Sequence, residues 1–173
     1  MKALPSNVNA IGDPVVKAKL ICETLRAALP SYDAMVLMFA NNGAWWRNYR
    51  MKIRAFSGAP AAASIEDFAA RVYTTGNPSD LGTLAVAFAR SASDGDDLYA
   101  LVESLVTSEF TYMTTVEGLG CLVLLAKVHK DIGQPRKAWM LWRKAMTFAQ
   151  VMVSCILIQP TVSSNGLFRA CTR

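Results

Sequence analysis

The chain has 173 residues, of which 53% are hydrophobic and 18% are charged. This length fits one domain, and this balance excludes an intrinsically disordered protein. The net charge of +5 would suit a nucleic-acid ligand, but the basic residues are spread along the chain. We expect them mostly to form solvated helix faces, since phosphate binding needs charges that converge on one surface.

The mean hydropathy of +0.24 is high for a small protein. It suggests either a face covered by a partner or a piece of something larger. The first residues lack the apolar stretch of a signal peptide, and the uncharged run over 145–168 is too polar to span a membrane. The cysteines have no zinc or redox spacing, so we expect reduced core thiols in an intracellular protein. They are Cys22, Cys121, Cys155 and Cys171.

Signals for the start of a helix recur along the chain: a capping side chain, often with proline as the first helical residue or an acidic residue three positions later. Residues 1–12 precede the first signal and are expected to form a flexible N-terminus. The start signals are Asp13-Pro14, Ser31, Ser64 with Asp67, Asn77-Pro78 and Thr114 with Glu117. The stop signals are Pro30, Gly43 and Asp94-Gly95.

No segment sustains the alternation of a strand, and the chain is rich in alanine, leucine and methionine, which favour helix. The sequence therefore predicts an all-α fold of seven or eight helices, arranged as a multi-helical array of antiparallel helix pairs. The helical domain should cover 13–152. Residues 153–173 are expected to be a poorly structured tail, because the helical period is lost after Pro160.

A helical hairpin is predicted over 115–152. Gly133 supplies a left-handed C-terminal cap, and Pro135 begins the second helix, so the two helices must pack antiparallel. Substituting Gly133 with valine should therefore be far more damaging than Gly95→Val. The second helix should bury one face, at spacings of three and four residues. The residues of that face are Ala138, Leu141, Trp142, Ala145, Ala149 and Met152.

This hairpin is similar to one tetratricopeptide repeat, although such a fold needs about three repeats to bury its core. It also resembles the regulatory (middle homology) region of fungal zinc-cluster transcription factors. The likeness rests on the turn Gly-Gln-Pro-Arg-Lys-Ala-Trp at 133–139, followed by Ala149-Gln150, and covers roughly 14–152. Further similar stretches are ALPSYDAM, NGAWWRNYRMKI, FAARVYTTGNPSDLGTLAVAFARS and LYALVESLV.

This resemblance implies a nuclear, all-α regulatory domain that is not an enzyme. Its partners would be other proteins or the rest of its own parent protein, with DNA contacted only indirectly. The family reads DNA with a six-cysteine cluster that binds two zinc ions. Here consecutive cysteines are 99, 34 and 16 positions apart, so the chain lacks that cluster and needs no cofactor of its own. The alternative is a tetratricopeptide-like scaffold for protein–protein interaction.

Candidate sites are few. His129 is expected to pack or to cap its helix as a partly exposed imidazole, and most carboxylates lie in helix caps. A possible interaction surface is Trp45, Arg47 and Arg50, although the spacing of Trp46, Tyr49 and Ile53 favours a buried helix face.

The segment from Val153 onward does not resemble the family. Val-Ser at its start is what a common splice donor encodes when it is translated. We therefore expect read-through of an unspliced intron, a domain that ends midway, and helix faces exposed for missing partners.

Overall fold

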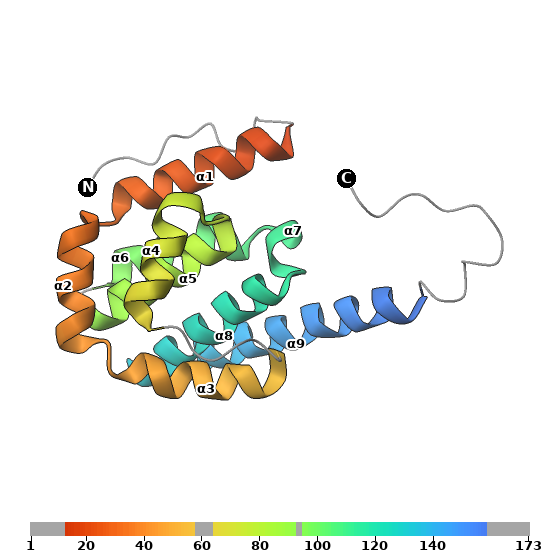
Figure 1. Cartoon of the computed structure of the whole chain (residues 1–173). Helices are drawn as coiled ribbons and strands as arrows, with labels where there is room; N and C mark the ends of the chain where they lie inside the picture. The colour runs from red at the N-terminus through yellow and green to blue at the C-terminus, as the bar shows by residue number, and fades with distance from the viewer. Residues whose placement is uncertain (1–12, 58–63, 93–94, 159–173) are drawn as a thin grey trace.

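The computed structural model describes residues 13–57, 64–92 and 95–158. These residues form nine α-helices and one π-helical turn, with no strand among them, which confirms the all-α prediction (Figure 1). The elements before the first gap are α1 (Pro14–Ala28), α2 (Tyr32–Asn42) and α3 (Trp45–Ser57). Between the gaps lie α4 (Ile65–Thr75) and α5 (Pro78–Ala92). The rest are α6 (Asp96–Val102), η2 (Glu103–Thr107), α7 (Phe110–Met113), α8 (Val116–Asp131) and α9 (Pro135–Ile158).

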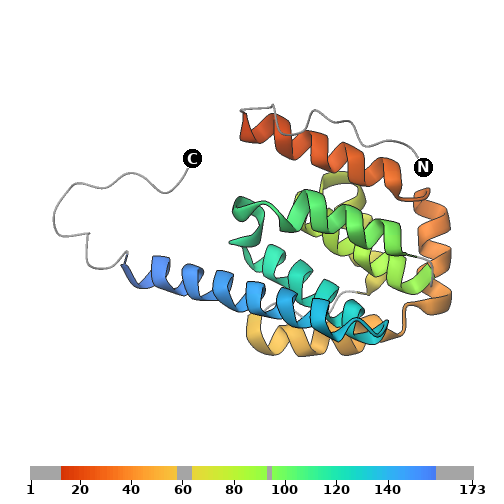
Figure 2. The ribbon, with the colours of Figure 1, turned by 180° about the vertical axis from the view of Figure 1, so that it is seen from behind.

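Helix α5 is the centre of the fold. Its sequence carries apolar or small residues on every side, and a helix of that kind is stable only when it is surrounded. Helices α1, α2 and α4 pack on it from the N-terminal half of the chain, and α6 and α8 from the C-terminal half (Figures 1 and 2). At Gly82 an added Cβ would lie 3.2 Å from Cys121 Sγ, so α5 and α8 approach closely.

Most of the predicted caps are present. The carboxylate of Asp13 accepts a hydrogen bond from the backbone N–H of Val15 at 2.8 Å. Ser64 and Asp67 form the reciprocal capping box of α4. Asn77 accepts from the backbone N–H of Asp80 at 2.9 Å. Each bond satisfies a backbone N–H that has no partner inside the helix.

Two of the predicted caps differ from the structure. Ser31 occupies the cap position of α2, but its side chain makes no capping bond. The cap of α8 is Thr115, which accepts from Gly118 N at 3.0 Å, and not Thr114. The cause is α7, the short helix just upstream: the Thr114 hydroxyl bonds back to the carbonyl of Phe110. This extra helix also makes the helix count exceed the seven or eight that were predicted.

The hairpin of α8 and α9 follows the prediction. Gly133 has φ of +80°, and two backbone hydrogen bonds close the turn, from Gln134 N to His129 O at 2.7 Å and from Gly133 N to Lys130 O at 3.2 Å. These are the two bonds of a Schellman motif, which needs a left-handed residue at this position. Pro135 is the first residue of α9. The two helices then pack along each other as an antiparallel pair (Figure 2).

The buried face of α9 is narrower than predicted. Ala138, Leu141 and Ala145 are buried, but Trp142 is 36% exposed and lies at the edge of the contact with α8. The helix also continues to Ile158, past the position where the tail was expected to begin. The remaining tail, 159–173, and the expected flexible segment, 1–12, lie outside the described residues.

The expected contrast between Gly133 and Gly95 is not supported by their surroundings. A Cβ on Gly133 would meet nothing within 4 Å, so only its backbone conformation opposes a side chain. A Cβ on Gly95 would lie 2.4 Å from Ala89 Cβ and 2.8 Å from Ala89 Cα. That contact with α5 is too close for any side chain, so valine at position 95 must also displace the backbone.

The thiols follow the prediction in part. Cys22 and Cys121 are buried and form no disulfide among the described residues, whereas Cys155 is exposed near the end of α9. Cys171 lies outside the described residues. Burial raises the pKa of Cys121 to about 12, with a smaller opposing effect from the Thr83 hydrogen bond. Among the described helices, none combines the length and apolar character that a membrane crossing requires.

Candidate functional site

A cleft of about 400 Å³ opens where the ends of four helices meet. The start of α3, the end of α5, the start of α6 and the end of α8 each contribute side chains to its wall. Because helix ends carry the caps and charged residues, this junction gathers polar groups that the helix interiors exclude. The lining residues are Trp45, Ala89, Arg90, Gly95, Asp96, Tyr99, Val128, Asp131 and Ile132.

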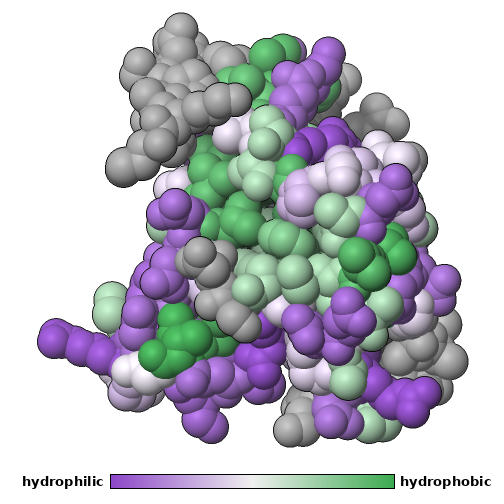
Figure 3. All heavy atoms as spheres, turned by 90° about the vertical axis from the view of Figure 1, so that its left-hand side faces the viewer, coloured by the Kyte–Doolittle hydropathy of each residue, from purple (hydrophilic) through white to green (hydrophobic). Residues whose placement is uncertain are grey.

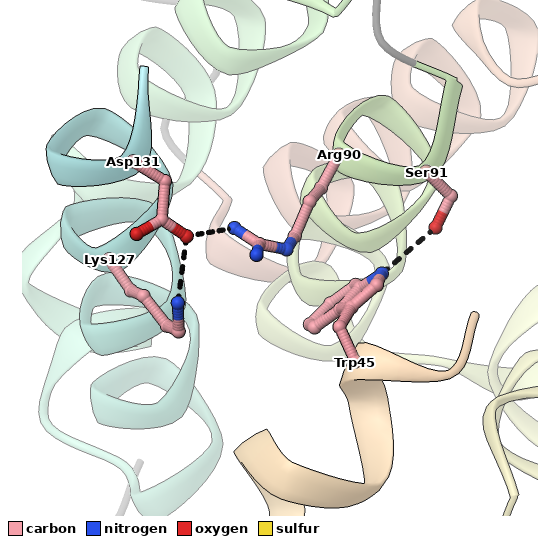
Figure 4. Close-up of polar contacts among 5 residues, drawn as sticks. All are labelled: Trp45, Arg90, Ser91, Lys127 and Asp131. Carbon is pink, nitrogen blue, oxygen red and sulfur yellow. Dashed lines mark hydrogen bonds and ion pairs between the residues drawn. The ribbon is translucent and has the colours of Figure 1, made fainter. Parts of the chain in front are cut away.

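Arg90 of α5 contacts two of the other helices at this cleft, α3 and α8. Its guanidinium lies over the ring of Trp45, 4.7 Å from the centroid, and it forms an ion pair with Asp131 of α8 (Figure 4). Asp131 also accepts from Lys127 Nζ at 2.7 Å. The indole N–H of Trp45 donates to the hydroxyl of Ser91 at 3.2 Å. The side chains of α3, α5 and α8 are thus fixed to one another at the cleft.

Two of the charged residues in the cleft, Arg90 and Asp131, form an ion pair with each other. Burial acts to raise the pKa of Asp131, but hydrogen bonds from Lys127 and Arg90, together with their charges, hold it below its usual value. Burial raises the pKa of Tyr99 to about 12, Arg90 opposes this, and Asp96 adds to it. At neutral pH the Asp131 carboxylate is therefore ionised and bound to two cations, and the phenol of Tyr99 is neutral.

The residues that line the cleft include no serine, cysteine or histidine. They therefore do not supply the serine–histidine or cysteine–histidine pairs that are common in nucleophilic catalysis. His129 lies elsewhere, and it is 2% exposed rather than partly exposed as predicted. Its Nε2 lies 2.6 Å from Glu103 Oε1, and Glu103 also pairs with Lys137 of α9 at 2.8 Å. His129 therefore has a packing role, as expected, in a contact that links α8, η2 and α9. Its Nδ1 has no hydrogen-bond partner among the described residues.

The three residues of the predicted interaction surface have separate surroundings. Trp45 is half-buried, and one face of its ring is taken by Arg90. Arg50 lies over the ring of Trp46, 5.6 Å from its centroid, and Trp46 is itself buried in the core. Arg47 is exposed. A role for these residues in binding stays a prediction, and the structure does not bring them into one aromatic and basic surface.

The α3 face favoured by spacing is buried in part as expected. Trp46 and Tyr49 belong to the core, and the Tyr49 hydroxyl donates to the carbonyl of Gly120 at 2.8 Å. Ile53 is part of α3, but its side chain is outside the described part of the structure.

A second feature is an exposed apolar face on α9; exposed helix faces were expected from the sequence in general, but this one was not located. Helix α9 presents several large apolar side chains to solvent, among them Trp139, Trp142 and Met146. The signal was available, because α9 has apolar residues on more than one side and a helix buried on one side only must expose some of them. Within the described residues, no group of three or more histidine, cysteine or carboxylate side chains could hold a metal ion.

Comparison with known proteins gives one partial similarity. No family model matches the chain, and no solved structure matches it. The chain is 40% identical over 57 residues to "Transcription factor sdnS" of Sordaria araneosa. The match covers 33% of this chain and 7% of that protein. Over that third of its length, the chain is therefore similar to a fungal transcription factor.

Proposed function

We propose that the chain is a non-catalytic regulatory domain of a fungal transcription factor. The observation that carries this proposal is the 40% identity over 57 residues to Transcription factor sdnS. The earlier resemblance to the regulatory region of zinc-cluster factors points to the same class of protein. A nuclear location and a domain that is one piece of a longer protein belong to the same proposal.

The fold supports a role in contact rather than in bond making. A continuous core surrounds α5, and the cleft side chains are held by paired charges and hydrogen bonds. A module of this kind can transmit the state of a ligand or a partner through rigid helices to an attached DNA-binding segment. Zinc would be required only by that segment, and DNA would be contacted only through it.

The alternative is a tetratricopeptide-like scaffold, which the α8–α9 hairpin favours. In such repeats each hairpin packs only on its neighbours in the sequence. Here α8 packs on α5, and α1, α2 and α4 pack on α5 as well. This arrangement around a central helix favours the regulatory domain over a stack of repeats.

The test is a tethering experiment. The chain is fused to a heterologous sequence-specific DNA-binding domain in a fungal cell that carries a reporter gene. We expect reporter output to differ by several-fold from that of the DNA-binding domain alone. Leu122→Asp, which places a carboxylate in the core, should abolish the difference, because Leu122 is fully buried.

Leu37→Asp is the matched control, since it makes the same change at a leucine that is 66% exposed on α2. It should leave the folded state intact. Reporter output equal to that of the DNA-binding domain alone, with the fusion present at normal levels, would contradict the proposal.

A further inference from the structure

Helix α9 carries a continuous apolar stripe on its outer side. We define the α9 stripe as Trp139, Trp142, Met146, Ala149 and Val153. Their spacings are three, four, three and four residues, which is the a and d pattern of a helix that packs against another helix. Trp139 is 55% exposed and Met146 60%, although core-forming helices bury such residues. In two opposite views the C-terminal half of α9 extends beyond the other helices (Figures 1 and 2).

The stripe is distinct from the face that α9 buries against α8. Ala138 and Ala145, which are buried, occupy positions beside the stripe on its inner side. Isolated exposed apolar residues are normal on a protein surface, but a contiguous row of them marks an interaction site. Tryptophan and methionine are also the residues that contribute most at the centre of protein interfaces.

The charge on α9 has one sign. The helix contains four basic residues and no acidic residue. Lys137 pairs with Glu103, and Lys144 donates to the carbonyl of Thr107, so both are engaged within the fold. Arg136 and Arg143 are exposed and lie one heptad apart along the outer border of the stripe. The guanidinium of Arg143 lies over the ring of Trp139, 4.8 Å from its centroid.

We propose that the α9 stripe is the docking surface for an acidic amphipathic helix of a partner protein. Leucine-like residues of that helix would cover Trp139, Trp142 and Met146, and its carboxylates would pair with Arg136 and Arg143. The stripe is about 21 Å long, from 14 helical steps of 1.5 Å, so a partner helix of roughly four turns covers it. The inference rests on the surface of α9 alone, whether or not the chain regulates transcription.

A second copy of the chain suits this surface poorly. Two α9 helices that pack in parallel through their stripes would bring Arg136 and Arg143 of each copy beside the same residues of the other. In an antiparallel pair these arginines would find no carboxylate on the other helix, because α9 has no acidic residue. Like charges at these positions oppose association, and the net charge of +5 on each chain adds to the repulsion. Neither arginine has an acidic partner on α9 itself that could offset this.

The face over α2 was the other candidate surface. Figure 3 shows hydrophobic residues gathered in the middle of the side that α2 forms in Figure 1, with hydrophilic residues around them. On α2, however, Leu37 is the one large apolar side chain that is clearly exposed, and no basic residue lies on that helix. This face therefore lacks both the row of anchors and the charge that specify a partner at α9.

The experiment measures binding of a labelled synthetic helix by fluorescence anisotropy at physiological salt. The probe has about two heptads, which correspond to roughly four helical turns, with leucine at positions a and d and glutamate at e and g. Its control has lysine in place of every glutamate. We expect saturable binding of the glutamate peptide with a micromolar Kd, and no binding of the lysine peptide.

Two methionines provide the matched variants. Met146 lies in the stripe and Met140 lies on another side of α9, and both are 60% exposed. Met146→Glu should weaken binding about tenfold or more, and Met140→Glu should leave the Kd unchanged. Arg143→Glu should weaken binding of the glutamate peptide and permit binding of the lysine peptide.

Several results would overturn the inference. One is the absence of saturable binding, and another is equal binding of the two peptides. A third is an equal loss of affinity in the two methionine variants. A fourth is dimerisation of the chain alone that Met146→Glu abolishes, since this would assign the stripe to a second copy.

Discussion

Changing Gly120 to alanine should stabilise the protein, whereas the same change at Gly133 or Gly118 should destabilise it. All three glycines lie in or directly after α8, and each change adds one methyl group. Gly120 is inside the helix, and an added Cβ would meet nothing within 4 Å. At Gly133 there is space as well, but φ is +80°. At Gly118 the Cβ would lie 1.9 Å from the carbonyl oxygen of Tyr112.

The magnitudes follow from these surroundings. Alanine at position 120 restricts the unfolded chain and favours helix, which contributes about 0.5–1 kcal/mol. Alanine at position 133 must adopt the left-handed conformation, which costs about 1–2 kcal/mol. Alanine at position 118 forces the backbone of α7 away from α8 and should cost about 3 kcal/mol. In a domain of this size, 1 kcal/mol corresponds to about 2–4 °C in Tm.

The assay is urea unfolding followed by circular dichroism, with Tm measured at the same protein concentration. The order of stability should be Gly120→Ala, wild type, Gly133→Ala and then Gly118→Ala. A Gly120→Ala variant less stable than wild type would contradict the packing around α8. A neutral Gly133→Ala would contradict the Schellman turn.

Four further predictions concern charge and chemistry. Burial opposes ionisation of Asp131, but its two cations hold its pKa below the usual value of an aspartate, so Asp131→Asn should reduce the free energy of unfolding at pH 7. That difference should vanish as the pH falls through the folded pKa of Asp131, and a difference that does not shrink on acidification would contradict this. Glu103→Ala leaves the buried His129 without its partner and should lower the free energy of unfolding by about 1–3 kcal/mol. Lys137→Ala keeps that partner and should lower it by less than about 1 kcal/mol. Equal losses of stability in the two variants would count against the contact between His129 and Glu103. In the native chain a thiol reagent should label Cys155 rapidly and the two buried cysteines only after unfolding, as mass spectrometry can show. Duplex DNA should bind weakly and without sequence preference, with affinity that falls steeply between about 50 and 200 mM salt; a specific site retained at physiological salt would refute this.

Local features of the fold could be predicted from the sequence because they depend on a few neighbouring residues. The capping box of Ser64 and Asp67 and the turn at Gly133 and Pro135 both occur as predicted. The cap of α8 was misplaced by one residue, because two threonines in a row offered the same side chain. The choice between them depends on where α7 ends, and four residues of helix leave little periodic signal.

Features that depend on which elements meet in space could not be predicted in the same way. Helical period shows that α9 has apolar residues, but it does not show which of them α8 covers, so Trp142 was placed on the buried face. The close approach of Gly95 to Ala89 also depends on how α5 and α6 are joined.

The cleft shows the same limit. Its central contacts join Trp45, Arg90 and Asp131, which lie on three helices and are separated by 41 or more positions in the sequence. No local spacing relates them, and charged residues at helix ends occur in every helical protein. The sequence singled out Trp45 for its neighbouring arginines on α3, whereas the cation that lies over its ring comes from α5.

The position of α5 has a consequence for synthesis on the ribosome. Helices that cover α5 are made both before it and after it, and α8 is complete only at Asp131. At about 5–20 residues per second, α5 therefore emerges some seconds before its last covering helices. During that interval its uncovered apolar sides are a surface that a chaperone would bind, and the nascent chain acquires its native core only once α8 has left the exit tunnel.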